Sequence, residues 1–110
     1  MPQRETVSEV IAAATLCVAV PVDRGGELAA GAQEVLESLP IVRYADVREI
    51  VEVDADDDGL AATIDCRLTL HVDAPSADGA TVREVLRETA LVRDVDRFAV
   101  VDGPYRIERW

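Results

Sequence analysis

The sequence predicts a single α+β domain in which helices cover one face of a mainly antiparallel sheet. Segments with helical spacing of apolar residues alternate along the chain with segments of strand-like alternation. A long hairpin with an acidic turn occupies the centre, and 110 residues are enough for one hydrophobic core. Because helices return the chain between strands, we expect them on one side of the sheet. We expect the domain to span residues 1–110.

The first part of the chain is predicted to be a helix, a strand and a second helix. Residues 6–9 have the spacing of a capping box, and apolar residues recur at helical spacing over 7–14. The apolar run 16–20 is too short for a helix and is typical of a strand covered on both faces. Residues 27–39 return to helical spacing, and Pro40 should end that helix.

The centre of the chain is predicted to be a hairpin over residues 42–72. A type I′ turn centred on residues 58–59 would suit the twist of the adjoining strands. With that turn Val53 lies opposite Ile64, and apolar residues meet on one face of the hairpin while polar residues meet on the other. The candidate sites below depend on this register.

The last third adds a helix and strand-like segments. Residues 81–92 begin with a capping box and form an amphipathic helix, and residues 98–101 are expected to form a strand. A turn at 102–104 separates this strand from the alternating segment 105–110. Together the elements predict a ferredoxin-like βαββαβ sandwich with an extra N-terminal helix.

The charge of the chain limits its partners and its surroundings. There are 22 acidic residues and 11 basic ones, all arginine, for a net charge of -11. A basic patch for nucleic acid or anionic membranes is not evident, and ions in a salt-rich cytoplasm would screen the self-repulsion. The alternative is an acidic protein from a mesophile with a GC-rich genome. Without an 18-residue apolar run or a signal-peptide pattern, we expect a cytoplasmic location, or a virion if the chain is viral.

The acidic turn has the spacing of a calcium loop. Asp54, Asp56, Asp58, Gly59 and Asp65 match the pattern of an EF-hand, whose alternating carboxylates supply oxygen ligands. The flanking residues alternate like strands, however, whereas an EF-hand loop lies between helices. We therefore expect a solvated turn and no cofactor, with Ca²⁺ as the alternative. Asp65 would join the ligands only if the turn were an open loop.

Two further constellations could carry acid–base chemistry. The predicted register places Asp46 beside His71, where a carboxylate could orient the imidazole of a general base. Glu49 falls on the apolar face, where burial would raise its pKa; the alternative is a β-bulge or an edge position that lets its side chain reach water. No nucleophile, second histidine or zinc motif accompanies these residues, so we expect a chain without catalysis of its own.

The distribution of large apolar residues indicates a protein partner. More apolar side chains fall in the predicted strands than one layer of helices can cover, and a small domain seldom leaves such a patch in water. We therefore expect a homo-oligomer or a complex with another protein. The predicted interface residues are Val18, Val20, Tyr44, Ile50, Phe98 and Trp110.

The layout suggests three functions. In its helix, its long hairpin over residues 42–72 and its following helix, the chain resembles ring-forming tail or neck proteins of tailed viruses, and its layout is also similar to dimeric α/β-barrel enzymes and small-molecule regulatory domains. We expect an interaction or assembly domain that uses its sheet face. The alternatives are a neck or tail ring component of a virus of a halophile, and a small ligand-binding or dimeric enzyme that uses Glu49, or Asp46 with His71.

Overall fold

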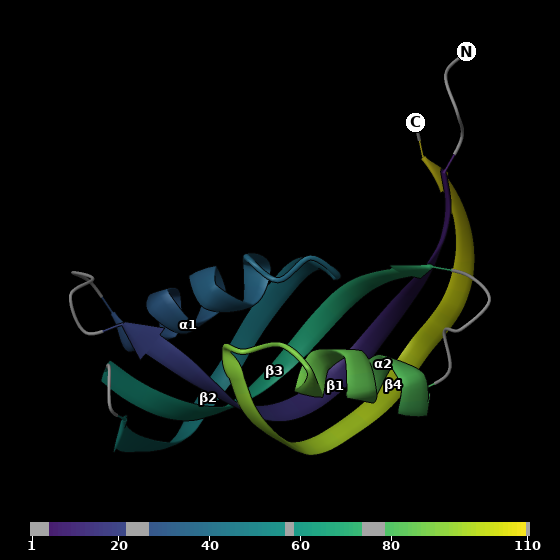
Figure 1. The fold of residues 1–110 in the computed structure, drawn as a ribbon. Coiled ribbons are helices and arrows are strands. Elements are labelled where there is room, and N and C mark those ends of the chain that lie inside the picture. The colour runs from purple at the N-terminus through teal and green to yellow at the C-terminus, as the bar shows by residue number, and fades with distance from the viewer. Residues whose placement is uncertain (1–4, 22–26, 57–58, 74–78, 110) are drawn as a thin grey trace.

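The computed structural model describes residues 5–21, 27–56, 59–73 and 79–109. Two helices and four strands follow one another in these segments (Figure 1). In chain order the elements are β1 (Glu5–Pro21), α1 (Leu28–Glu37), β2 (Val42–Asp56), β3 (Gly59–Asp73), α2 (Gly79–Arg87) and β4 (Val92–Arg109).

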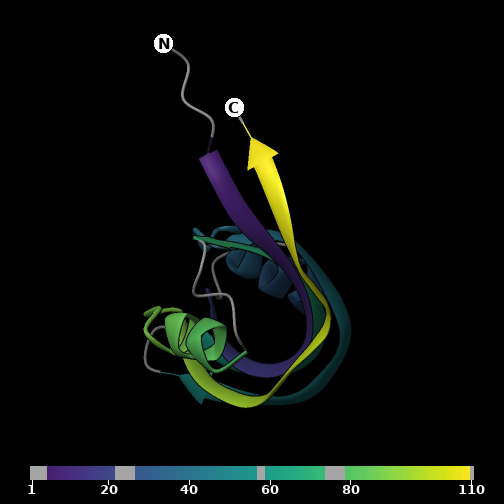
Figure 2. The same ribbon diagram turned by 90° about the vertical axis from the view of Figure 1, so that its right-hand side faces the viewer.

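The four strands form one sheet in the order β2-β3-β1-β4, and every neighbouring pair is antiparallel. The sheet is strongly curved, and both helices lie on its concave side (Figure 2). We call the opposite side the outer face. On the two central strands it carries the odd-numbered residues, 9–19 of β1 and 61–71 of β3, whereas the even-numbered residues are buried toward the helices.

The predicted N-terminal helix is wrong, because residues 5–21 form β1. The apolar residues of this segment also repeat at every second position, and β1 pairs with β3 on one side and with β4 on the other. Pairing and burial on both sides outweigh the helix propensity of the alanines at 12–14. The residues of β1 that are buried toward the helices are Val10, Ala12, Ala14, Leu16, Val18 and Val20.

The predicted fold class is corrected accordingly. A ferredoxin-like sandwich with an added N-terminal helix is not what the described residues form; they form a small α+β fold that is mostly sheet, with four antiparallel strands and two helices. The segments predicted as a strand, a turn and a further alternating stretch also differ, since residues 92–109 run as the single strand β4. Neither helix within the described segments has the length and apolar character needed to cross a membrane.

The hydrophobic core lies between the concave side of the sheet and the helices. Leu16, Ile64 and Leu68 from the central strands are completely buried there, as are Leu36 of α1 and Leu86 of α2. Burying one such side chain stabilises the folded state by about 1.5–3 kcal/mol. The core therefore fixes the position of the central strands, and with them the side chains of the outer face.

The predicted hairpin is present, but its predicted register is wrong. Asp56 pairs with Gly59, and Val53 lies opposite Ala62 instead of Ile64. The register of β2 against β3 also shifts at three places, between Val42 and Tyr44, between Val47 and Glu49, and between Ile50 and Glu52. Each shift adds a residue to the edge strand β2, as in a β-bulge, and changes which side chains reach the outer face.

Candidate functional site

The outer face is the part of the sheet that no described helix covers. Along β1, in the middle of the sheet, its side chains are small or medium in size and half-buried: Ile11, Ala13, Thr15, Cys17 and Ala19. The same face of β3 adds Ala61 and Thr63. These positions follow directly from the alternation of β1, and the sequence interpretation missed them because it made the first half of this segment helical.

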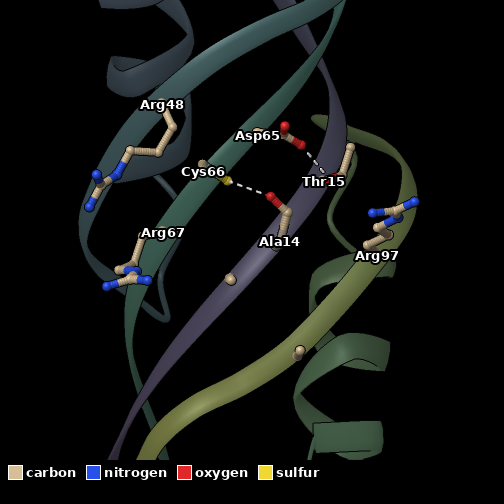
Figure 3. A pocket seen from close by; sticks show the side chains of 9 residues that line it. Ala14, Thr15, Arg48, Asp65, Cys66, Arg67 and Arg97 are labelled. Carbon is tan, nitrogen blue, oxygen red and sulfur yellow. Dashed lines mark hydrogen bonds between the residues drawn. The ribbon is translucent and has the colours of Figure 1, made fainter.

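A shallow pocket of about 390 Å³ lies on the outer face and receives residues from all four strands. Arg67 extends on one side of it and Arg97 on the other (Figure 3). Between them Ala13 of β1 pairs with Ala99 of β4, and their small side chains leave the space open. The lining residues are Ala13, Ala14, Thr15, Arg48, Asp65, Cys66, Arg67, Arg97 and Ala99.

One edge of the pocket is rigidly held by hydrogen bonds between β1 and β3. The Thr15 hydroxyl donates to Asp65 Oδ1 at 2.6 Å, and the Cys66 thiol donates to the Ala14 carbonyl at 3.6 Å (Figure 3). Burial raises the pKa of Cys66 from 9.0 to about 12, and the charges of Asp65 and Asp46 add to the effect. The Cys66 thiol therefore stays protonated at neutral pH and is not an activated nucleophile.

The arginines of the pocket differ in their partners. Arg48 Nε lies 2.8 Å from Asp46 Oδ2, and both side chains are largely exposed. Arg67 and Arg97 are exposed as well, and neither makes an ion pair or a side-chain hydrogen bond with the described residues. Two guanidinium groups without a carboxylate partner among the described residues therefore flank the pocket of a chain whose net charge is -11.

The second feature of the outer face is an imidazole–carboxylate pair. His71 Nε2 lies 2.9 Å from Glu9 Oε1 across β3 and β1, and the two side chains are only 13% and 28% exposed. His71 Nδ1 is buried and has no hydrogen-bond partner among the described residues. On β4, Tyr105 lies opposite Glu9 and donates its hydroxyl hydrogen to Asp102. This hydrogen bond, together with the charge of Asp102, raises the pKa of Tyr105.

The predicted Asp46–His71 pair is not formed. Asp46 lies opposite Arg67 and binds Arg48, while the partner of His71 is Glu9. The shifted register of β2 is the physical reason. A histidine held by a carboxylate can act as a general base, but no hydroxyl or thiol among the described residues is hydrogen-bonded to His71.

Glu49 is an exposed residue of the edge strand β2, opposite Asp65 on the outer face. The prediction that it lies on the apolar face opposite Leu68 is therefore wrong. A register shift between Val47 and Glu49 moves it outward, which is the bulge that the sequence offered as the alternative.

The predicted calcium ligands are only partly within the described residues. Asp54 is exposed near the end of β2; Asp56 belongs to β2, but its side chain is not among those described, and Asp58 lies outside the described residues. Asp65 lies six residues along β3 from Gly59 (59 to 65), or about 20 Å, and binds Thr15. It is therefore too far from the turn to join such a site. No cluster of three or more metal-binding side chains occurs within the described segments.

Most of the predicted interface residues lie on the concave side. Val18 and Val20 are in the core, and Ile50 and Phe98 pack against it. The apolar run of β1 has candidate side chains on both faces, so the sequence does not show which face meets the helices. Tyr44 does lie on the outer face, 55% exposed and opposite Thr69. Trp110 lies outside the described residues.

Comparison with known proteins adds no homology to this geometry, because no family model, curated protein or solved structure matches the chain.

Proposed function

We propose that this chain is a non-enzymatic interaction domain that binds another protein molecule, identical or different, through its outer face. The observation that carries the proposal is the half-buried row of small side chains on β1, in the middle of a sheet face without a helical layer. A sheet face of this kind is usually packed against another layer. Arg67 and Arg97, which pair with no carboxylate in the described segments, have charge available for a partner.

The alternative of a small enzyme has less support. The pocket on the outer face is lined by neither Glu49 nor His71, and its thiol is protonated because burial raises the pKa of Cys66. The Glu9–His71 pair lies in another part of the face, without a hydrogen-bonded nucleophile among the described residues. An assembly role accounts for the pocket and the bare face together.

The setting of this function follows from the net charge. A charge of -11 fits a salt-rich cytoplasm, or a virion assembled in one.

A single added charge on the outer face tests the proposal. Ala13→Arg places a large cation in the middle of the half-buried row, beside Arg67, and Ala80→Arg places the same charge on the exposed side of α2 as a control. In sedimentation velocity at micromolar concentration, wild type and Ala80→Arg should form the same complex, and Ala13→Arg should be folded and monomeric. Association of Ala13→Arg equal to wild type would refute the outer face as the binding surface.

A further inference from the structure

We propose that the partner on the outer face is a second copy of this chain, related by a two-fold axis parallel to the central strands, so that Glu49 of each copy lies over Arg97 of the other. The inference rests on the proposed function and names its partner and its register. A symmetric pair of identical faces is the commonest way in which soluble chains associate.

The first support is the charge of one row of side chains across the sheet. Pairing between neighbouring strands places Glu49 beside Asp65, Asp65 beside Thr15, and Thr15 beside Arg97. The row therefore begins with an acid on the edge strand β2 and ends with a base on the edge strand β4. Both end residues are exposed. A two-fold axis between β3 and β1 exchanges the ends of the row, so each acid meets a base.

The neighbouring row is complementary in size. It runs from Asp46 through Arg67 and Ala13 to Ala99. The half on β2 and β3 therefore carries large polar side chains. The half on β1 and β4 carries only the methyl groups of Ala13 and Ala99, which are small enough for the pocket of about 390 Å³ to remain open above them. The same axis places Arg67 of one copy above this pocket in the other. Asp65 lines the pocket and offers its carboxylate to the incoming guanidinium.

A third row of side chains across the sheet also has complementary ends under the two-fold axis. Tyr44 and Asp102 are the ends of the row through Thr69 and Ile11, so the axis brings a hydroxyl donor over a carboxylate.

In the row through Thr63 and Cys17, in contrast, the ends are Glu52 and Asp94, which repel each other. We therefore infer a contact confined to the three favourable rows, which are also the central part of a sheet that curves away at its ends (Figure 2).

The pair of Glu49 and Arg97 is not formed within one copy. The two residues lie on opposite edges of the sheet, three interstrand spacings or about 14 Å apart, and neither makes an ion pair with a described residue. A mixture of the two single charge reversals can recover association only through contacts between molecules. This property makes a charge-exchange experiment specific for the inferred dimer.

The experiment uses Glu49→Arg and Arg97→Glu in sedimentation velocity at low ionic strength. Each variant alone turns two symmetry-related attractions into repulsions, so its dimer dissociation constant should rise at least about ten-fold. An equimolar mixture of the two variants should recover dimers, because every contact in the mixed dimer joins opposite charges. The double variant Glu49→Arg/Arg97→Glu should dimerise like wild type. Glu88→Arg and Arg87→Glu, on or beside α2, are the matched controls and should have no effect.

The outcomes separate this inference from the proposed function. If the reversals leave wild-type association unchanged, or if the mixture recovers nothing while Ala13→Arg still dissociates the complex, the two-fold register is wrong and the outer-face function stands. A monomeric wild type that binds a polyglutamate peptide, with loss of binding in Arg97→Glu, would overturn the dimer and assign the face to an acidic protein partner. A monomeric wild type that does not bind this peptide would refute both the dimer and an acidic partner for this face.

Discussion

Glu9 and His71 face each other across the two central strands, with 2.9 Å between Glu9 Oε1 and His71 Nε2. The pair joins β1 and β3 on the outer face, in the same row as Tyr105 of β4. The His71 side chain is 13% exposed and the Glu9 side chain 28%, so both groups have lost most of their hydration and depend on each other for hydrogen bonding.

Removing the Glu9 carboxylate should destabilise the fold. Glu9→Ala leaves the largely buried His71 ring without its described partner, and we expect the free energy of unfolding to fall by about 1–3 kcal/mol. Glu9→Gln, whose amide can still form a hydrogen bond, should lose less. Urea denaturation measures both, with the exposed Glu88→Ala as the control, expected within about 0.5 kcal/mol of wild type. If Glu9→Ala matched that control, the pair would have no structural role.

Cys66 should make the protein less stable in alkaline solution. Burial raises the pKa of Cys66 from 9.0 to about 12, so above pH 9 the unfolded chain loses this proton while the folded chain keeps it. The stabilisation by the folded-state thiol is complete below pH 9 and is lost as pH rises toward 12. Between pH 9 and 10.5 the loss is about 2 kcal/mol. The chain contains no lysine, but Tyr105, whose pKa is raised by its hydrogen bond to Asp102, also loses its proton in alkaline solution, so the contribution of the thiol is isolated with a Cys66 variant.

Urea denaturation at pH 8 and pH 10.5 measures this loss. In Cys66→Ala the free energy of unfolding should fall less between the two pH values than in wild type, by about 2 kcal/mol. Cys17→Ala keeps Cys66 and should behave like wild type. An identical alkaline loss in Cys66→Ala would show that another group is responsible.

Leu16 should be among the most sensitive core positions. It is completely buried in the central strand β1, and truncation to alanine leaves a cavity in addition to removing buried surface. We expect Leu16→Ala to lower the free energy of unfolding by about 2–5 kcal/mol. Leu91→Ala is the matched control, because Leu91 is 38% exposed, and thermal melting should separate the two variants clearly. Equal losses would place residue 16 outside the core.

Gly103 should not tolerate a side chain. Its φ is +88°, in the region that residues with a Cβ rarely adopt, and an added Cβ would lie 2.5 Å from the Glu9 carbonyl oxygen. We expect Gly103→Ala to destabilise the fold by about 1–3 kcal/mol. At Gly79 an added Cβ meets only the Val100 side chain, at 3.6 Å, so Gly79→Ala should be neutral or slightly stabilising. A harmless Gly103→Ala would mean that β4 does not approach β1 closely at this point.

The sequence predicted the later elements better than the first. Apolar spacing located α1 within residues 27–39 and the start of α2 near residue 81, and both helices are observed there. The first part of β1 was missed, although residues 16–20 were correctly predicted as a strand. Alanines with apolar neighbours fit a helix as well as a central strand, and the choice depends on pairing with β3 and β4, which are distant in sequence.

The candidate sites failed for a related reason. A single-residue shift in β2 changes every cross-strand neighbour, and the three shifts observed there separate Asp46 from His71 and move Glu49 outward. Glu9 could not be proposed as the partner of His71 while residues 7–14 were interpreted as a helix. The pocket also has no local signal in the sequence, because its arginines come from three strands that only the sheet brings together.

Association of the wild-type chain is the most direct test of the inferred dimer. The molar mass should be measured by light scattering after size-exclusion chromatography, from micromolar to near-millimolar protein, in dilute buffer and in molar salt. The account predicts a species of twice the 11.9 kDa chain mass that dissociates on dilution. A constant mass of 11.9 kDa under all of these conditions would contradict self-association, and with it the two-fold dimer.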